Sequence, residues 1–161
     1  MIESARAALG ERAEYVVADA QELPFADGSF DVVVCRIAAH HFADLELAVA
    51  EMARVSNRLV VVEDTLYISE QQEEAERLRD PSHVRSRSED EWKQLFVDAG
   101  VEVEQVEFFE KVHKLDEWLA RTGCEGEEAA RVTELLGPQL DDDGTAWRDT
   151  KILLKGRKSQ S

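Results

Sequence analysis

Short apolar runs alternate with amphipathic stretches along this chain, and that alternation predicts an α/β fold. The first two apolar runs are unbroken rather than alternating, which is typical of strands covered on both faces. In the longest run the apolar positions change phase between Val103 and Val106, which predicts a bulge or bend. The predicted strands are Tyr15–Ala18, Phe30–Cys35, Arg58–Glu63, Val101–Val112 and Trp147–Leu154.

Capping residues and helical spacing predict helices between these strands. Gly10 ends the first helical stretch, and Asp44 caps one whose apolar positions share a face. Ser69 and Ser88 each begin a capping-box sequence. Strand, helix and strand in succession form a βαβ unit and predict a parallel pair. The predicted helices cover residues 2–9, 45–55, 70–79, 89–99, 115–122 and 127–136.

Composition narrows the class of protein. The 161 residues are enough for one domain, which we place at residues 1–158 with a polar tail at 159–161; the residues from Lys155 on are basic and polar. The net charge of −16 opposes binding to nucleic acid or to anionic membranes. No apolar run is long enough for a membrane span and no secretory pattern opens the chain, so a cytoplasmic protein is expected.

The cysteine and acid spacings predict no metal site. Cys35 and Cys124 lie far apart without metal-type spacing, so two reduced thiols are expected. Glu63 and Asp64 are adjacent acids, but no further histidine or cysteine converges on them by spacing.

The stretch from Asp19 to Phe42 carries the most specific motif. It reads Asp-Ala-x-x-Leu-Pro-Phe-x-Asp-x-x-Phe-Asp-Val-Val, followed by His-His-Phe and then by Glu-Met-Ala-Arg-Val. This pattern resembles the class I S-adenosylmethionine-dependent methyltransferases, in the branch that includes ubiquinone-biosynthesis-type enzymes. The resemblance extends to about Lys158, more weakly after Val112. It implies a Rossmann-like sheet with an antiparallel C-terminal edge pair, S-adenosylmethionine as cofactor, and methyl transfer to a small-molecule acceptor.

The resemblance also implies cofactor contacts at the carboxyl ends of the strands, where open α/β sheets bind ligands. The Asp19 carboxylate accepts from the adenine amino group, the Ala20 backbone closes over the ring, and Gln21 follows in the same segment. The alternative for Asp19 is an ordinary turn residue. Arg36 lies beside the methionine arm, where its guanidinium either meets a carboxylate of the cofactor or substrate or points into solvent.

Histidines supply the candidate catalytic groups. By resemblance, the loop with His40 and His41 faces the methyl-transfer centre, and a neutral imidazole can take a proton from an acceptor. The alternative, favoured for at least one of the two, is that the ring caps the helix or packs beside Phe42. His83 and Arg85 lie in a loop on the substrate side and are candidates for substrate contact. A helix-breaking turn with solvated charges is the alternative for both.

Part of the family pattern has no counterpart in this sequence. The first two family strands, the Gly-rich loop and the ribose-binding acid are lacking, because Tyr15–Ala18 already aligns with the third strand. We therefore expect an N-terminally truncated domain. Either Tyr15–Ala18 pairs directly with Phe30–Cys35, or it is displaced, or another chain supplies the lacking part. Exposed strand edges predict homo-oligomerisation. The alternative function is a degenerate methyltransferase-like domain that binds no cofactor and acts through protein contacts.

Overall fold

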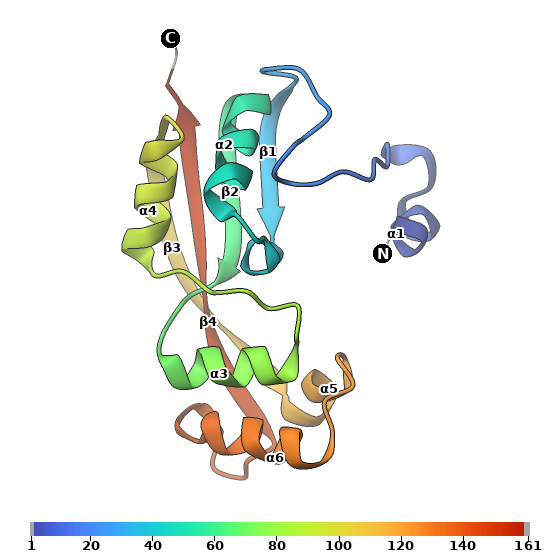
Figure 1. The fold of residues 1–161 in the computed structure, drawn as a ribbon, viewed down its shortest axis with the longest axis vertical. Helices are drawn as coiled ribbons and strands as arrows, with labels where there is room; N and C mark the ends of the chain where they lie inside the picture. Colours follow the sequence, from blue (N-terminus) through green and yellow to red (C-terminus); the bar gives the residue numbers. More distant parts are fainter. Residues whose placement is uncertain (1, 160–161) are drawn as a thin grey trace.

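The computed structural model describes residues 2–159, which form a mixed four-stranded sheet with helices packed against it (Figure 1). The strands lie in the order β1-β2-β4-β3. β1 and β2 run parallel, whereas β4 is antiparallel to both of its neighbours. The predicted α/β sheet with an antiparallel edge pair is therefore confirmed. The strand bounds are β1 Phe30–Arg36, β2 Ser56–Thr65, β3 Val101–Lys114 and β4 Ala146–Lys158.

The helix signals read from the sequence are found in the structure. The Asp44 side chain caps α2, the Ser69 side chain caps α3, and Ser88 and Glu91 form the complete capping box of α4. These caps satisfy backbone N–H groups that have no partner within the helix. The α-helices are α1 Ile2–Leu9, α2 Leu45–Val55, α3 Glu70–Arg79, α4 Glu89–Asp98, α5 Leu115–Ala120 and α6 Gly126–Leu135, with 3₁₀ turns η1 Gly10–Arg12, η2 Ala39–His41 and η3 Gly137–Gln139.

Two apolar cores lie one above the other along the long β3–β4 hairpin (Figure 1). In the upper core, α2 and α4 pack on the sheet around Val60 and Phe96, both fully buried. In the lower core, α3, α5 and α6 pack around Trp118 and Trp147. The upper core is packed so tightly that a Cβ atom added to Gly156 would lie 2.5 Å from Cγ1 of Val101. β4 contributes side chains to both cores and so joins them.

The edge of the sheet at β1 differs from the prediction. Residues Tyr15–Ala18 belong to no strand of the described chain, and the side chains of Val16 and Val17 are 51% and 85% exposed. β1 is an edge strand, and Val34 on its outer face is 61% exposed. The expectation that both runs are covered on two faces is thus wrong: Val32 and Val34, alternate residues of β1, share one face of the sheet, and that face is left uncovered at β1. Within the described chain, Tyr15–Ala18 is displaced from β1 rather than paired with it.

The far end of the chain is more ordered than its composition predicts. β4 continues to Lys158, so most of the expected tail from Lys155 on is strand. Lys155 and Arg157 form ion pairs with Glu104 of β3 at 3.0 and 2.5 Å, which explains basic residues in this strand. The bulge in β3 is confirmed, with a register shift between Val103 and Gln105.

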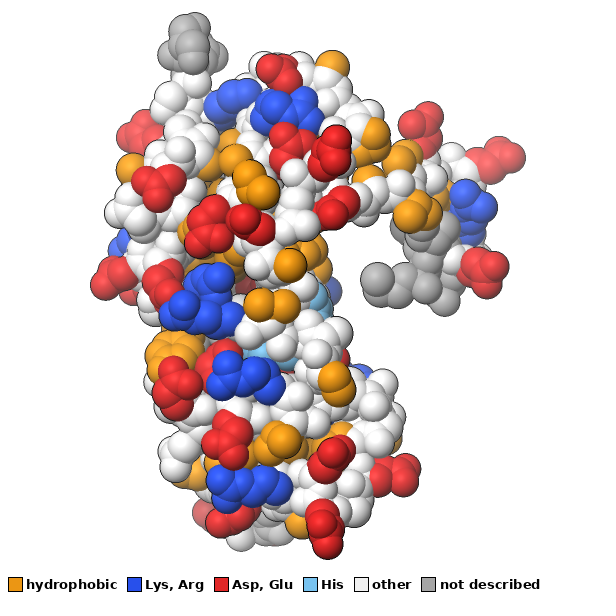
Figure 2. Space-filling view, in the orientation of Figure 1, with side chains coloured by type: hydrophobic (Ala, Val, Ile, Leu, Met, Phe, Trp, Pro, Cys, Tyr) orange, Lys and Arg blue, Asp and Glu red, His pale blue; other side chains and the backbone are white. Residues whose placement is uncertain are grey.

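The surface and the thiols agree with the composition. Figure 2 shows acidic side chains over both halves of the visible face, with lysines and arginines scattered among them. Cys35 and Cys124 are both buried free thiols, as predicted. Among residues 2–159, every helix is too short or too polar to cross a bilayer.

Candidate functional site

The carboxyl ends of β1 and β2 form one rim, and the backbone there is strained. Ile37 follows β1 with φ of 48°, a left-handed conformation that costs a β-branched residue about 1–2 kcal/mol. Its backbone N donates to the Glu63 carbonyl at 2.7 Å, so the turn is tied to the end of β2. Strain of this kind concentrates at functional sites. This conformation could not be predicted from the residue type, because isoleucine does not favour it.

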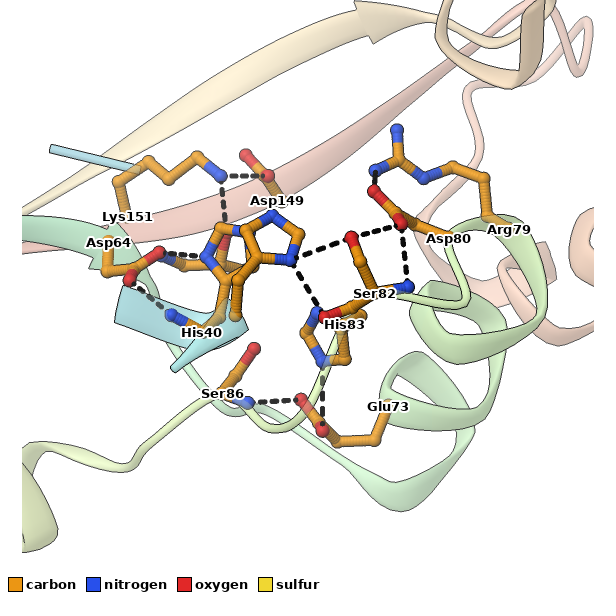
Figure 3. A network of polar contacts seen from close by, with 12 residues as sticks. His40, Asp64, Glu73, Arg79, Asp80, Ser82, His83, Ser86, Asp149 and Lys151 are labelled. Atoms are coloured by element: carbon orange, nitrogen blue, oxygen red, sulfur yellow. Dashed lines mark hydrogen bonds and ion pairs between the residues drawn. The ribbon is translucent and has the colours of Figure 1, made fainter. Parts of the chain in front are cut away.

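One buried carboxylate holds the turn η2 against the end of β2. Asp64 is 1% exposed and accepts from the backbone N of His40 at 2.9 Å and from that of Thr65 at 2.7 Å. It also bonds Nδ1 of the His40 ring (Figure 3). His40 is therefore a buried anchor of the turn, and its ring is oriented by Asp64.

The structure brings the three predicted histidines of the rim into one cluster. The ring centroids of His40 and His41 lie 4.1 Å apart, and His83 lies 5.3 and 6.5 Å from them. The loop after α3 reaches the cluster because the backbone N of Val84 and that of Arg85 both donate to the His40 carbonyl. His40 and His83 are buried in this cluster, whereas His41 is partly accessible at the rim.

The three rings have different environments. His83 is buried, and its Nε2 lies 3.2 Å from Oε2 of Glu73 (Figure 3). His41 is half-buried, and its Nδ1 contacts the carbonyl oxygen and the hydroxyl of Ser82. Of these rings, His41 has the accessibility that a group acting on a substrate requires.

Arg85 is not brought into the cluster by its side chain. Its guanidinium donates to Oε1 of Glu91 at 2.6 Å, on the side of α4. Only its backbone contacts His40. The structure therefore separates the two substrate candidates, with His83 inside the cluster and the charge of Arg85 outside it.

The acids around the cluster are held ionised. Burial opposes ionisation of Glu73, but hydrogen bonds from His83 and Ser86 outweigh it and lower the pKa of Glu73. Asp80 is similar: burial opposes its ionisation, while hydrogen bonds from Ser82 lower its pKa. Burial first, and then the charge of Asp64, raise the pKa of Cys35 to about 12, so this thiol stays neutral on the rim.

A second group of buried polar residues lies next to the end of β2, and the sequence analysis did not identify it. Lys151 donates to Thr65 Oγ1 and pairs with Asp149, both at 2.6 Å (Figure 3). His113 Nε2 lies 3.2 Å from the same Asp149 carboxylate. Burial opposes ionisation of Asp149, but His113 and Lys151 lower its pKa. A lysine and an aspartate two residues apart within a buried strand were the available signal.

The predicted cofactor residues gather at the same end of β1. Asp19 is exposed, and its Oδ1 accepts from the backbone N and Nε2 of Gln21 at 2.9 and 3.1 Å. Oε1 of Gln21 accepts from the backbone N of Asp44, which ties the segment to the start of α2. Ala20 and Arg36 line one apolar cavity of about 470 Å³ that follows β1. The Arg36 side chain is 66% exposed and pairs with Glu63 at 2.9 Å.

The Leu-Pro-Phe loop of the motif is clamped by α2. Arg54 donates to the carbonyl oxygens of Phe25 at 2.8 Å and Leu23 at 3.0 Å. Glu51, one turn earlier, accepts from Arg54 and from the backbone N of Leu23. The Glu and Arg of the Glu-Met-Ala-Arg-Val segment therefore have a physical role: they fix the loop that shapes the cavity. Sequence reasoning named the segment but not this contact.

Among the described residues, histidine, cysteine and acid side chains form no group of three or more suited to a metal ion.

Sheet order, rim and cavity together define a Rossmann-like methyltransferase fold, and comparisons with known proteins agree. A family model described as a methyltransferase domain matches residues 1–58. Over its first 58 residues the chain is thus similar to a methyltransferase domain.

Individual relatives make the relationship more specific. The chain is 32% identical over 157 residues to the uncharacterized methyltransferase YcgJ of Bacillus subtilis, covering 93% of this chain and 60% of that protein. The crystal structure of YcgJ superimposes with a TM-score of 0.88 at 28% identity, covering 99% of this chain and 77% of that one. The chain is also similar to a demethylmenaquinone methyltransferase of Thermus thermophilus. This match is 44% identical over 59 residues and covers 35% of this chain and 27% of that protein. The chain therefore spans 60% of the length of the curated YcgJ protein.

Proposed function

We propose that this chain carries the acceptor side and part of the cofactor side of a site for S-adenosylmethionine-dependent methyl transfer to a small molecule. The observation that supports this proposal is that the cavity lined by Ala20 and Arg36 is also lined by Ala38 and Phe42, the residues on either side of the turn that carries His40 and His41. A methyl acceptor at His41 and a cofactor at Ala20 would then lie at neighbouring positions. Alignment of this kind is the main requirement of an in-line displacement.

The residues present fit the adenosine part of the cofactor. An exocyclic amine needs a fixed acceptor, and the Asp19 carboxylate is exposed and oriented by Gln21. The ring needs apolar cover, which Ala20, Leu23 and Phe42 offer in the cavity. When bound, the cofactor supplies a methyl group on a sulfonium centre. Arg36, which also lines the cavity, would meet the cofactor carboxylate after exchanging its contact with Glu63.

His41 would act on the acceptor, and His40 would hold the turn. An imidazole within reach of the acceptor can remove the proton that is lost on methylation. His40 is buried against Asp64, so its part in this proposal is to fix the position of its neighbour. His83 would close the wall of the same pocket with its ring held by Glu73.

Calorimetric titration with S-adenosylmethionine and S-adenosylhomocysteine tests the cofactor side. We expect saturable binding that is lost in Asp19→Ala. Asp31→Ala is the matched control, because Asp31 is an exposed acid of the same region that does not line the cavity. Absence of binding by a folded chain, or equal loss in both variants, would overturn the proposal.

The open edge of β1 favours a second candidate, a methyltransferase-like domain that acts through contacts with a second copy of itself. An unpaired edge strand with exposed valines is a template for association. Sedimentation velocity on Val34→Lys tests this, with Val97→Lys of α4 as the control at matched exposure, 61% against 62%. Concentration-dependent association that only Val34→Lys removes would support it, and a monomer at all concentrations would exclude it.

A further inference from the structure

The two contacts at Nδ1 of His41 determine where the proton of that ring lies. The carbonyl oxygen of Ser82 lies at 3.0 Å and its hydroxyl oxygen at 3.1 Å. A carbonyl oxygen only accepts hydrogen bonds. The one hydrogen of the hydroxyl is donated to Oδ1 of Asp80 at 2.6 Å, so its oxygen also faces the ring as an acceptor. Both contacts therefore require N–H at Nδ1, which leaves the lone pair of the neutral ring on Nε2.

Asp80 makes this arrangement specific. Its Oδ1 also accepts from the backbone N of Ser82 at 2.9 Å, so one carboxylate orients both the hydroxyl and the backbone of that residue (Figure 3). The carboxylate is anionic at neutral pH, as its lowered pKa indicates, although Arg79 lies 3.6 Å from its second oxygen. An anion one hydroxyl away from an imidazole favours the protonated ring.

We propose that Ser82 and Asp80 are positioning residues that keep Nε2 of His41 available as a base and stabilise the imidazolium it becomes. This inference rests on the proposed function and narrows the acceptor to an atom that carries a proton, such as a hydroxyl oxygen or an acidic carbon. In the step, the acceptor–hydrogen bond breaks and its proton goes to Nε2. The released electron pair forms the bond to the methyl carbon, and the electrons of the carbon–sulfur bond return to sulfur.

The neighbouring titratable groups do not duplicate this role. His40 has Nδ1 on Asp64, and His83 has Nε2 on Glu73, so each has a buried carboxylate of its own. Both rings face His41 at the centroid distances given above, and protonation of either would disfavour an imidazolium at His41.

Nuclear magnetic resonance of the whole chain labelled with ¹⁵N-histidine tests the proposal without any turnover. His41→Gln assigns the His41 signals. We expect the neutral ring of His41 to be protonated at Nδ1, which is the minor tautomer of free histidine. Protonation at Nε2 would overturn the proposal, because no lone pair would then face an acceptor.

Variants separate positioning from mere packing. Asp80→Asn keeps the side-chain shape, but its NH₂ group can donate to the Ser82 hydroxyl, which is then free to donate to Nδ1 of His41. We therefore expect the fraction of the neutral His41 ring that is protonated at Nδ1 to fall in this variant. The control Asp98→Asn makes the same change at an exposed site on α4 and should leave that fraction unchanged. In a Ser82→Ala background the effect of Asp80→Asn should shrink, since the hydroxyl link is gone.

Two results would contradict these expectations. An equal change of the His41 tautomer in Asp80→Asn and Asp98→Asn would show a general charge effect. A full effect of Asp80→Asn without the Ser82 hydroxyl would remove Ser82 from the role. If the His41 tautomer and its changes in the variants are as expected but the chain does not bind the cofactor, the proposed function is contradicted. The positioning role of Ser82 and Asp80 would still hold.

Discussion

Replacing Asp64 by asparagine removes the charge on which the rim is assembled. The carboxylate accepts three hydrogen bonds, from two backbone N–H groups and from the ring of His40. An amide of the same shape offers one oxygen and one NH₂ group, so at least one buried N–H would face another donor. Losing a hydrogen bond to a buried charged group costs about 1.5–3 kcal/mol, and an unsatisfied buried donor adds to it. We therefore expect the free energy of unfolding to fall by about 3 kcal/mol.

Urea unfolding followed by tryptophan fluorescence measures this change, because Trp92, Trp118 and Trp147 are all buried. At a typical slope of about 2 kcal/mol/M, the midpoint should fall by about 1.5 M. Glu63→Gln is the matched control, since it makes the same chemical change one residue earlier in β2. The partner of Glu63 is a largely exposed arginine, so that change should cost less than about 1 kcal/mol. An Asp64→Asn cost no larger than the control would refute the role of Asp64 as the anchor.

Three further predictions follow from buried positions. Burial raises the pKa of Glu76, so its ionisation opposes folding; this cost is absent below the ordinary pKa and appears as pH rises through the folded value. Glu76→Gln should therefore stabilise the chain against urea at pH 8 and have little effect at pH 4, whereas an equal effect at both pH values would contradict this. Gly156→Ala should lower the free energy of unfolding, measured by thermal denaturation, by about 2–3 kcal/mol, because the added Cβ atom would lie 2.5 Å from Cγ1 of Val101. Gly137→Ala, with no atom within 4 Å of its Cβ, is the control that should be nearly neutral. In a Cys124→Ser background, Cys35 should react with a disulfide reagent at pH 8 only after unfolding, since its pKa is raised to about 12. Rapid labelling of the native chain would show that this thiol is not buried as described.

Signals that act over a few residues predicted most of the fold. The caps at Asp44 and Ser88 place the starts of α2 and α4, and the spacing of apolar positions gives the faces that pack. The place of a strand within a sheet depends instead on distant segments. The run of valines in β1 predicts cover on both faces, yet Val32 and Val34 are exposed because the face of the sheet that they share is uncovered at β1. The same local pattern predicts a strand at Tyr15–Ala18, where the structure has none.

In the site too, local motifs were predicted from the sequence, whereas contacts between distant residues were not. The motif pointed to His40 and His41, and the structure brings both to the rim. It could not show which ring is buried, because that depends on Asp64, 24 residues away from His40. The contact of Ser82 with His41 spans 41 residues and forms only because the loop after α3 folds back onto η2. Pairings of that range leave no periodic trace in the sequence.

The position of β4 has a consequence for how the chain is made. β4 comes last among the strands but lies between β2 and β3 (Figure 1). Leu59 pairs with Arg157, so about a hundred residues separate these partners along the chain. During synthesis the inner edges of β2 and β3 stay open until residues Ala146–Lys158 have left the ribosome. Both halves of the molecule are thus completed by one late insertion, and such distant pairings fold slowly. A ribosome paused before that segment would expose two unfinished edges to chaperones and to other nascent chains.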